Sequence, residues 1–504
     1  MSVNKDILLG IDFGTSSCKV SAITFSGDLV CDCSVEYPTE FAHEGWAEQD
    51  PADWYNAMCT ALRILRERDS LDLSRVLAVA FDGSTHNAVL LDKNMCPVRK
   101  TIMWTDQRSV EECRFLQAHY GKEIFETAYQ KVAPTWTLPQ LRWISTHEKG
   151  VLEKTEHILF VKDCVRYLVT GVALTDYIEA QGTLFFDMNK MQWSEELASL
   201  AGVRLSQLPV LADPADVVGK VTSKAAAETG LPEGTPVVCG TSDSAVEDYG
   251  SGAIEPGDCI VKLATAGNVN VMTAEAHPYP STLTYSHVIK GMFYTVSATN
   301  AAALCQRWFR DGFCGEEKTL AQQQNVSAFA LMEALAGKSV PGANGVFFHP
   351  YLQGERSPYW DPDLRGSFTG VSIRNDKGDF LRALMEGVAY SLRDCYRTIE
   401  QMRLEVNRII LIGGGSRSPL WSSIVSNVFD LPVLVPTPGD ASFGSALLAG
   451  TGAGVFADRK EAVKRCLHPD RQILPSGEEA AFYRKGFQTY LQIHDALADV
   501  YSKK

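Results

Sequence analysis

The stretch that decides the fold is Ile7–Ser16, which reads ILLGIDFGTS. Its first part is a short apolar run typical of a buried β-strand, and its second part is a turn with glycine and two hydroxyl residues. Such a turn suits an anion, because glycine lets the backbone approach closely while amide N–H groups and hydroxyls donate to phosphate oxygens. The pattern returns about half a chain later at Cys259–Gly267, which reads CIVKLATAG. We therefore predict a phosphate-binding turn used twice around one cleft, rather than two ordinary β-turns.

Length and composition are those of a large globular protein. The 504 residues suggest two large halves, and a hydrophobic content of 45% with 21% charged residues excludes the disordered and fibrous classes. A net charge of −14 disfavours a broad surface for nucleic acid or an anionic membrane. The N-terminus shows no signal peptide and no run approaches a bilayer span, so we expect a cytoplasmic protein. The 13 cysteines are scattered, and we expect reduced, mostly buried thiols.

Strand-like runs alternate with longer helical patterns along the chain, which predicts a layered α/β fold. The similarity between Ile7–Ser16 and Cys259–Gly267 is a first echo, meaning a sequence pattern that occurs once in each half of the chain. A second echo is the pair Arg75–Ser84 (RVLAVAFDGS) and Arg408–Ser416 (RIILIGGGS), and each of these segments follows the predicted phosphate turn of its half. The two echoes together favour an internal duplication. The small-residue stretch from 244 to 257 is the predicted hinge between the two lobes.

Two aspartates are candidates for chemistry. Asp12 lies inside the first phosphate turn, and a carboxylate beside a phosphate calls for a cation between them, which predicts bound Mg²⁺. Asp243 stands among small hydroxyl residues at the end of a strand, directly before the predicted hinge. We interpret it as the base that takes the proton of a substrate hydroxyl as that oxygen attacks a γ-phosphate. The alternative is a helix N-cap.

Two further groups suit ligands. The run Gly413–Gly415 lets a flat base or ribose press against the backbone, with Ser418 and Asn427 on the following helix as partners, although a simple tight turn is the alternative. The run is not a dinucleotide-binding fingerprint, because the last position of the Gly-x-Gly-x-x-Gly pattern is Ser418 and not glycine. Polar residues at Ser84–Asn87 and Trp104–Arg108 have the mixture that a sugar pocket uses. For His86 and Trp104 the alternatives are a structural histidine and a core tryptophan.

Taken together, these motifs resemble the FGGY family of carbohydrate kinases over nearly the full length, and xylulokinases most closely. The segments that carry the resemblance are Gly10–Ser16, Trp46–Pro51, Trp104–Arg108, Lys162–Asp163, Gly240–Ala245, Gly354–Gly370 and Ile412–Gly415. The resemblance implies two actin-like, ribonuclease-H-like lobes around a central cleft. Residues 1–246 would form the lobe with the sugar site and the first phosphate turn, and residues 247–504 the ATP-binding lobe. It also implies ATP and Mg²⁺ as cofactors and a homodimer.

The resemblance also assigns roles by position. Asp243 would be the catalytic base and, with Asp12, a metal ligand. The residues implied to bind ATP are Gly14, Thr15, Ser16, Thr265, Gly267, Gly414, Gly415, Ser418 and Asn427. Those implied to meet the sugar are Thr85, His86, Asp106, Asp243 and Ser244.

The predicted reaction is transfer of the γ-phosphoryl group of ATP to a terminal hydroxyl of a ketose, with D-xylulose and D-xylulose 5-phosphate as substrate and product. Two departures bear on the sugar, since xylulokinases usually have Met where Thr85 stands and Asn where Ser244 stands. Another pentulose, a polyol or a sugar acid is therefore the alternative substrate. A sugar sensor without turnover and a nucleotide-switching actin-like protein are the remoter alternatives.

Overall fold

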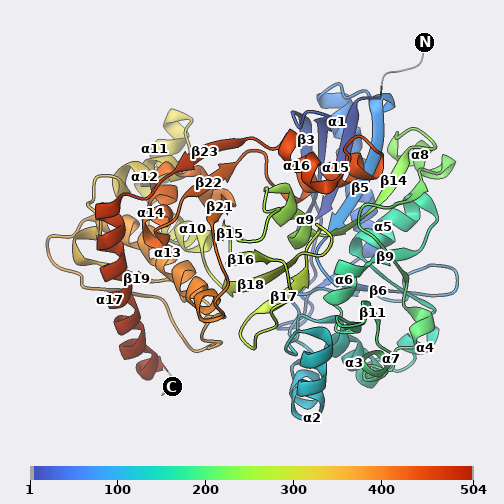
Figure 1. Cartoon of the computed structure of the whole chain (residues 1–504), viewed down its shortest axis with the longest axis horizontal. Helices are drawn as coiled ribbons and strands as arrows, with labels where there is room; N and C mark the ends of the chain where they lie inside the picture. Colours follow the sequence, from blue (N-terminus) through green and yellow to red (C-terminus); the bar gives the residue numbers. More distant parts are fainter. Residues whose placement is uncertain (1–4, 502–504) are drawn as a thin grey trace. The chain divides into compact units, whose positions relative to one another are not determined.

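In the computed structural model, which describes residues 5–501, Ile7–Phe13 forms strand β1 inside a six-stranded sheet (Figure 1). The strand order is β13-β14-β5-β1-β2-β3. Strands β1, β5 and β14 run parallel, while β2, β3 and β13 run antiparallel to their neighbours. The bounds are β2 (Ser17–Thr24), β3 (Leu29–Glu36), β5 (Val76–Gly83), β13 (Val217–Lys220) and β14 (Pro236–Ser242).

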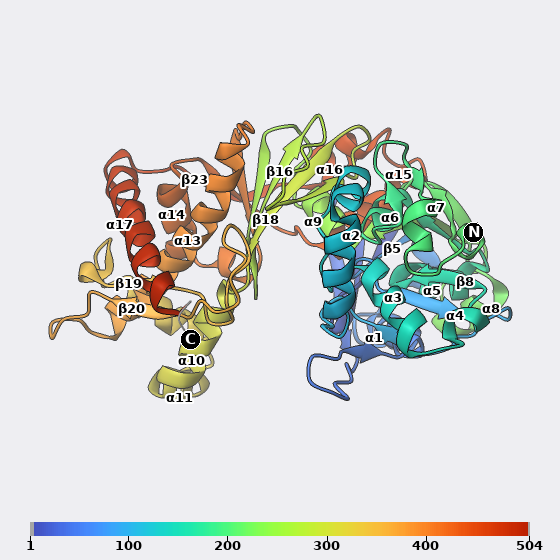
Figure 2. The same cartoon turned by 90° about the horizontal axis from the view of Figure 1, so that it is seen from below.

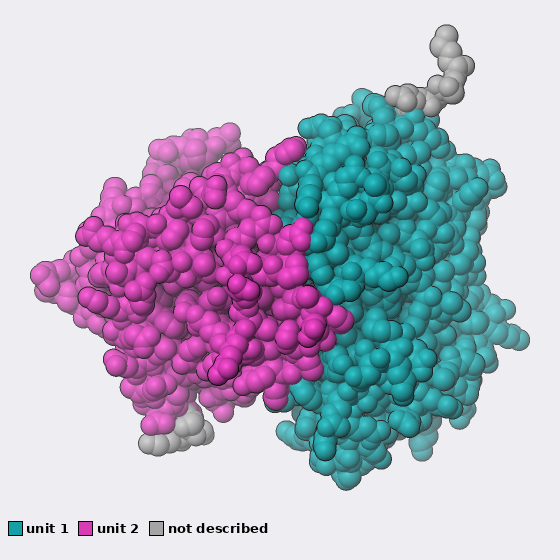
Figure 3. Space-filling view, in the orientation of Figure 1, with its two compact units in different colours: residues 1–254, 285–292, 438–467 teal, residues 255–284, 293–437, 468–504 magenta. Residues whose placement is uncertain are grey.

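The chain divides into two compact units, coloured separately in Figure 3. Unit 1 comprises the chain up to Ile254 together with Tyr285–Met292 and Pro438–Leu467. Unit 2 comprises Glu255–Thr284, Phe293–Thr437 and the chain from His468 onward. The first crossing, between Ile254 and Glu255, falls within the predicted hinge at 244–257, but the first part of that stretch is helix α9 (Asp243–Gly250) rather than a flexible linker.

Helices cover both faces of the sheet in unit 1. Helix α1 (Pro51–Arg68) begins after Asp50, whose side chain accepts the N–H of Ala52 at 3.0 Å, and its apolar face packs with α5 (Val161–Thr170) on one side of the sheet. Helix α15 (Ala441–Gly452) packs on the opposite side, together with α9.

Gly10 is what lets α15 approach β1 so closely. A Cβ atom at Gly10 would lie 1.7 Å from the carbonyl oxygen of Ser442 and 2.6 Å from the amide nitrogen of Ala446. Because side chains alternate along a strand, Asp12 is directed to the same face as Gly10. A glycine two residues before the predicted metal ligand therefore sets how closely α15 packs beside it.

Unit 2 repeats the plan of unit 1. The strands that lie wholly within it are ordered β18-β16-β15-β21-β22-β23, with β15, β21 and β22 parallel. Their bounds are β15 (Asp258–Leu263), β16 (Gly267–Thr273), β18 (Phe293–Thr299), β21 (Arg408–Ile412), β22 (Val433–Pro436) and β23 (Pro469–Ile473).

The core of unit 2 forms between this sheet and the long helix α13 (Lys377–Gln401). Figures 1 and 2 show α13, α14 (Pro419–Phe429) and α17 (Gly477–Tyr501) packed against one another. The remaining helices of this unit are α10 (Ala303–Phe313), α11 (Gly315–Gln324) and α12 (Ala328–Ala336).

The echoes seen in the sequence fall at equivalent positions of the two sheets. Strands β3-β2-β1-β5-β14 of unit 1 correspond in order and direction to β18-β16-β15-β21-β22 of unit 2. The first echo therefore matches β1 with β15, and the second matches β5 with β21. This shared topology confirms the α/β fold with a duplicated plan.

The remaining helices and strands complete the two units. The other helices of unit 1 are α2 (Val110–Ala128), α3 (Thr137–His147), α4 (Val151–Lys154), α6 (Tyr177–Gln181), α7 (Glu195–Ser199), α8 (Ser223–Thr229) and α16 (Arg459–Cys466). Its two-stranded sheets pair β4 (Glu48–Gln49) with β7 (Thr101–Ile102), β6 (Ala88–Leu91) with β8 (His157–Phe160), β9 (Leu174–Asp176) with β12 (Val210–Ala212), and β10 (Phe186–Asp187) with β11 (Gln192–Trp193). In unit 2, β19 (Phe347–His349) pairs with β20 (Ser367–Thr369), while β17 (Leu283–Ser286) spans the second crossing of the chain. Single turns of 3₁₀ helix lie at Leu73–Arg75, Leu205–Gln207, Ala343–Gly345 and Gly414–Arg417.

None of the helices formed by residues 5–501 is both long enough and apolar enough to span a bilayer. Most of the cysteine side chains are buried.

Candidate active site

The predicted catalytic residues of unit 1 gather at the carboxyl ends of three neighbouring parallel strands. Asp12 lies near the end of β1, Thr85 and His86 follow β5, and Asp243 follows β14. Ligand sites of α/β folds form at this edge of a parallel sheet. The structure therefore brings these sequence-predicted residues into one region of unit 1.

The first phosphate turn is held by its own backbone and by three side chains, of which Tyr37 donates its hydroxyl to the carbonyls of Gly14 and Ser17. The amide of Gly14 donates to the carbonyl of Ser17 at 3.0 Å, and Gln49 Nε2 donates to the carbonyl of Thr15 at 2.7 Å. The indole N–H of Trp104 donates to Thr15 Oγ1 at 3.1 Å. Because that hydroxyl accepts from the indole, its own proton is directed elsewhere and suits a phosphate oxygen. The predicted sugar segment and the phosphate turn thus touch directly.

Asp12 lies among other acids. It stands opposite Asp82 in the β1–β5 register, and its Oδ1 is buried without a hydrogen-bond partner among the described residues. Burial, opposed in part by a hydrogen bond with Asp82 and reinforced by the negative charge of Asp243, raises the pKa of Asp12 to about 7. A cation would relieve both the desolvation and the repulsion, so the residues fit the predicted metal.

The metal that fits is one that needs few protein ligands. Among residues 5–501 no three His, Cys, Asp or Glu side chains are grouped as a metal site. Mg²⁺ usually keeps several waters and takes one or two carboxylates with substrate phosphates, so a single pair such as Asp12 and Asp243 suits it.

Asp243 is the first residue of α9, and Ser242 occupies the N-cap position. The N-cap position thus falls one residue before Asp243, whose carboxylate nevertheless accepts a backbone amide at the start of the helix. Its Oδ1 accepts from Thr85 Oγ1 at 3.1 Å, from the amide of Ser244 at 2.7 Å and from Ser244 Oγ at 3.2 Å. Both residues that depart from xylulokinase usage, Thr85 and Ser244, thus contact the predicted base.

His86 occupies a strained backbone position, with φ of 55°. Its amide donates to Glu179 Oε1, and its carbonyl accepts from Thr137 Oγ1 at 2.6 Å. The ring packs on Trp136 with centroids 4.9 Å apart, and burial lowers its pKa to about 3. Its Nδ1 has no hydrogen-bond partner among the described residues. A neutral, firmly held imidazole with an unused nitrogen suits a ligand hydroxyl.

A buried ion cluster supports the strand that delivers Asp243. Lys162 Nζ lies 2.6 Å from Asp163 Oδ1 and 2.9 Å from Asp176 Oδ2, and Arg166 Nη1 lies 2.9 Å from Asp163 Oδ1. All four side chains are fully buried. Asp176 Oδ1 also accepts from Thr241 Oγ1 at 2.7 Å, two residues before Asp243. The Lys162–Asp163 motif is therefore structural support for the base.

Asp106 lies in a buried ion pair with Arg108. The residue is fully buried, and its Oδ2 accepts the amide of Ala47 at 2.6 Å. The guanidinium of Arg108 binds the same carboxylate through Nε at 2.9 Å and Nη2 at 2.7 Å, and it stacks over Trp46 at 3.7 Å. These contacts give Asp106 a structural role, and its predicted contact with the sugar stays a prediction.

In unit 2 the second phosphate turn is held by α10. The carbonyl of Thr265 accepts from the amides of Ala302 at 3.0 Å and Leu304 at 3.3 Å. A Cβ atom at Gly267 would lie 2.8 Å from Leu392 Cδ2 and 3.1 Å from Ala302 Cβ, so a larger residue would require these side chains to shift. Thr265 and Gly267 are therefore packed into one turn, as the sequence predicts.

The glycine run of unit 2 also follows a strand end. Gly413 has φ of 87°, and a Cβ at Gly414 would meet no atom within 4 Å, which leaves that backbone open to a ligand. Ser418 caps α14, where its Oγ accepts the amide of Trp421 at 3.0 Å. A Cβ at Gly415 would lie 2.8 Å from Leu263 Cβ.

Asn427 lies in α14 with its amide already engaged. Its Nδ2 donates to Glu479 at 2.7 Å and its Oδ1 accepts the amide of Ser476 at 2.7 Å. Both contacts fasten α14 to the start of α17, so the structure gives Asn427 a packing role, and its predicted contact with adenosine stays a prediction.

Sequence reasoning missed Asp82, Glu179 and Thr137 as members of the site. Asp82 stood in the run Arg75–Ser84, where an acid at the end of an apolar strand is a usable signal. Glu179 and Thr137 belong to no motif, and only the fold brings them to His86.

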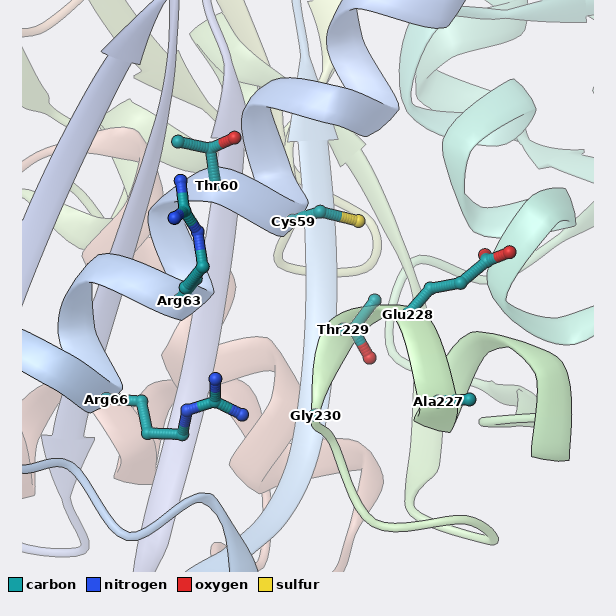
Figure 4. Close-up of a pocket in the computed structure, with 8 residues that line it drawn as sticks. All are labelled: Cys59, Thr60, Arg63, Arg66, Ala227, Glu228, Thr229 and Gly230. Carbon is teal, nitrogen blue, oxygen red and sulfur yellow. The ribbon is translucent and has the colours of Figure 1, made fainter.

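A surface pocket of about 210 Å³ lies elsewhere in unit 1, between α1 and α8 (Figure 4). Its lining residues are Cys59, Thr60, Arg63, Arg66, Ala227, Glu228, Thr229 and Gly230. None of the predicted site residues lines it, and we assign it no part in the reaction.

A glycine-rich turn with hydroxyl residues, a buried acid suited to a cation and a second acid beside a polar loop are the groups that a phosphotransferase requires. Comparison with known proteins specifies which kind. The N-terminal domain of the FGGY family of carbohydrate kinases matches residues 7–250, and the C-terminal domain of the same family matches residues 262–453.

Individual relatives span the whole chain. The xylulose kinase of Staphylococcus epidermidis is 30% identical over 97% of this chain and 97% of its own length. The gluconokinase of Bacillus subtilis is 27% identical over 98% of this chain and 97% of its own. The crystal structure of a xyloylose kinase from Brucella ovis superposes with a TM-score of 0.87 at 28% identity, covering 98% of this chain and all of that one.

The chain belongs to the FGGY family of carbohydrate kinases. It is an ATP-dependent sugar phosphotransferase with the two-domain, actin-like fold of that family.

Proposed function

We propose that the sugar is a ketose and that the reaction converts D-xylulose to D-xylulose 5-phosphate. The observation that carries this proposal is the similarity to xylulose kinases over the full length of the chain. The contact of Asp243 with the Thr85–His86 loop at the carboxyl edge of the sheet in unit 1 supports phosphoryl transfer to a sugar hydroxyl held there.

In the proposed reaction Asp243 accepts the proton of the terminal hydroxyl as that oxygen attacks the γ-phosphorus of ATP. His86 orients the sugar through its unused Nδ1, since burial lowers the pKa of the ring, Glu179 and Thr137 hold the His86 backbone, and Trp136 packs against the ring. Gly14, Thr15 and Ser16 donate to the γ-phosphate. Phosphoryl transfer has a loose transition state, so alignment by these groups matters more than the basicity of Asp243.

Mg²⁺ is part of the proposal. It would be held by Asp12 and Asp243, partly through water, and it would neutralise charge that develops on the phosphate oxygens.

Unit 2 is proposed to supply the nucleotide-binding groups. Thr265 and Gly267 would bind phosphate, and Gly414, Gly415 and Ser418 would border the adenosine. The open backbone at Gly414 and the packed turn at Gly267 support these roles. The division into an N-terminal sugar part and a C-terminal ATP part stays a prediction, and so does the homodimer.

The second candidate substrate is a sugar acid. Thr85 and Ser244 place two hydroxyls on the Asp243 carboxylate where xylulokinases usually have Met and Asn. The similarity to a gluconokinase over 98% of the chain also favours testing this class.

The test is ADP formation by the purified protein with ATP and Mg²⁺ against pentuloses, hexuloses, polyols and sugar acids. We expect saturable turnover, greatest with D-xylulose. Greatest turnover with gluconate or another sugar would overturn the xylulose assignment and show that the two hydroxyls reshape the pocket.

The assignment of the base is tested separately. Asp243→Asn should abolish turnover while ATP binding, measured by calorimetry, persists. Ser251→Ala, a buried serine just beyond α9, is the matched control and should retain turnover. Near-normal activity of Asp243→Asn would refute its role as base.

A further inference from the structure

One charged side chain of α10 lies on the second phosphate turn. Arg307 Nη2 donates to Thr265 Oγ1 at 2.7 Å. The first turn of the same helix is fastened to the same segment, since the amide of Ala303 donates to the carbonyl of Ala264 at 2.7 Å and that of Ala302 to Thr265 at 3.0 Å. The guanidinium is therefore placed by a rigid element relative to the turn.

The direction of this hydrogen bond matters for an anion. A guanidinium has only donors, so Thr265 Oγ1 accepts from Arg307 and keeps its own proton for another acceptor. Arg307 keeps further N–H groups in a planar fork that matches the geometry of phosphate oxygens. Hydroxyl and guanidinium together present donors and a positive charge at one place.

The charge of Arg307 is not neutralised by a protein carboxylate. The ion pairs of the described residues include none for Arg307, whose side chain is exposed. Arg310, one turn further along α10, is by contrast bound to Asp311 at 2.9 Å. Of the two arginines in α10, Arg307 is the one for which the described residues supply no carboxylate partner.

The turn itself is poor in donors. Thr265 is its one hydroxyl residue, because Ala264 and Ala266 flank it. The first turn has two hydroxyl residues, Thr15 and Ser16. An added guanidinium would offset the missing hydroxyl with a stronger, charge-assisted hydrogen bond.

We propose that Arg307 binds the polyphosphate of ATP at the second phosphate turn. This rests on the proposed role of Thr265 and Gly267 as a phosphate turn. Arg307 acts in binding and takes no proton.

The experiment measures ATP and ADP affinity of the full-length protein by calorimetry with Mg²⁺, for wild type, Arg307→Gln, Arg307→Lys and the control Arg310→Gln. We expect Arg307→Gln to weaken ATP binding about tenfold, Arg307→Lys to weaken it less, and Arg310→Gln to leave it within twofold. Kinetics should show a higher KM for ATP with the KM for sugar unchanged.

Salt separates a charge contact from a merely structural one. Between 50 and 500 mM NaCl, wild-type affinity for ATP should fall more steeply than that of Arg307→Gln, because the variant lacks one screened charge. Unchanged ATP affinity in Arg307→Gln, or parallel salt dependences, would overturn the proposal. If the chain proved to act on no sugar, weaker ATP binding by Arg307→Gln would still support the inference, so the two failures are distinguishable.

Discussion

Replacing Lys162 with methionine should cost unit 1 about 3–5 kcal/mol of unfolding free energy, because removing one member of a buried ion pair leaves uncompensated charge. Lys162 and Arg166 face Asp163 and Asp176, so two cations balance two carboxylates, and none of the four side chains reaches solvent. Burial raises the pKa of the neighbouring Glu179 carboxyl well above its usual range. Methionine fills the volume of lysine but leaves the cluster with a net negative charge.

Thermal unfolding followed by circular dichroism measures the effect. For a unit of this size roughly 2 °C is lost per kcal/mol, so Tm should fall by about 6–10 °C. Lys190→Met is the matched control, since Lys190 pairs with Asp187 at 3.1 Å but its side chain is 68% exposed. That variant should change stability by less than about 0.5 kcal/mol.

A double variant tests the charge balance itself. Lys162→Met with Asp176→Asn restores neutrality, and asparagine still caps α6, so the pair should be less destabilised than the sum of the single variants. A Tm of Lys162→Met within 2 °C of wild type, or strictly additive losses in the double variant, would refute the reasoning.

Three other perturbations give separate tests. Thr85→Val removes the hydrogen bond to Asp243, so kcat should fall about tenfold at unchanged KM for ATP, whereas Thr85→Ser should keep most of the activity; equal kcat for Val and wild type would contradict this. Gly10→Ala forces a Cβ to 1.7 Å from the Ser442 carbonyl and should cost about 3 kcal/mol or prevent soluble expression, so an unchanged Tm would speak against the close packing of α15. Burial lowers the pKa of His349 to about 4 in the folded protein. Below pH 6.5 the unfolded state therefore takes up a proton that the folded state does not. The free energy of unfolding should fall by up to about 1.4 kcal/mol per pH unit as the pH is lowered from 6.5 to 4. In denaturant titrations His349→Gln should flatten this slope, and identical slopes would exclude the histidine as its source.

The sequence predicts the parts of the fold that short local patterns encode. Apolar runs ending in glycine turns are visible as strings of residues, and the two echoes place β1 with β15 and β5 with β21. The position of Asp243 after a strand is visible in the same way. Each of these features depends only on neighbours along the chain.

Residues that act through long-range contacts escape this kind of reading. Asp106 is a residue type that often binds sugar hydroxyls, but its carboxylate accepts hydrogen bonds from Arg108 and the Ala47 amide. No local sequence pattern reveals the contact with Ala47. Asn427 is taken up by Glu479, which lies in another helix. Glu179 and Arg307 carry no motif and gain their meaning from His86 and Thr265, which only the folded chain brings to them.

The late segment Pro438–Leu467 belongs to the unit that begins at the N-terminus, and its helix α15 covers one face of the first sheet against Gly10. During translation the part of this face that α15 covers stays exposed until the ribosome has passed Gly452, after the strands of the second sheet up to β22 have been made. A nascent chain paused at Ile254 would have α9 but lack α15, and a fragment cut there should need a chaperone or the separately supplied α15 segment to stay in solution. Completion of the first unit therefore waits for the synthesis of most of the second.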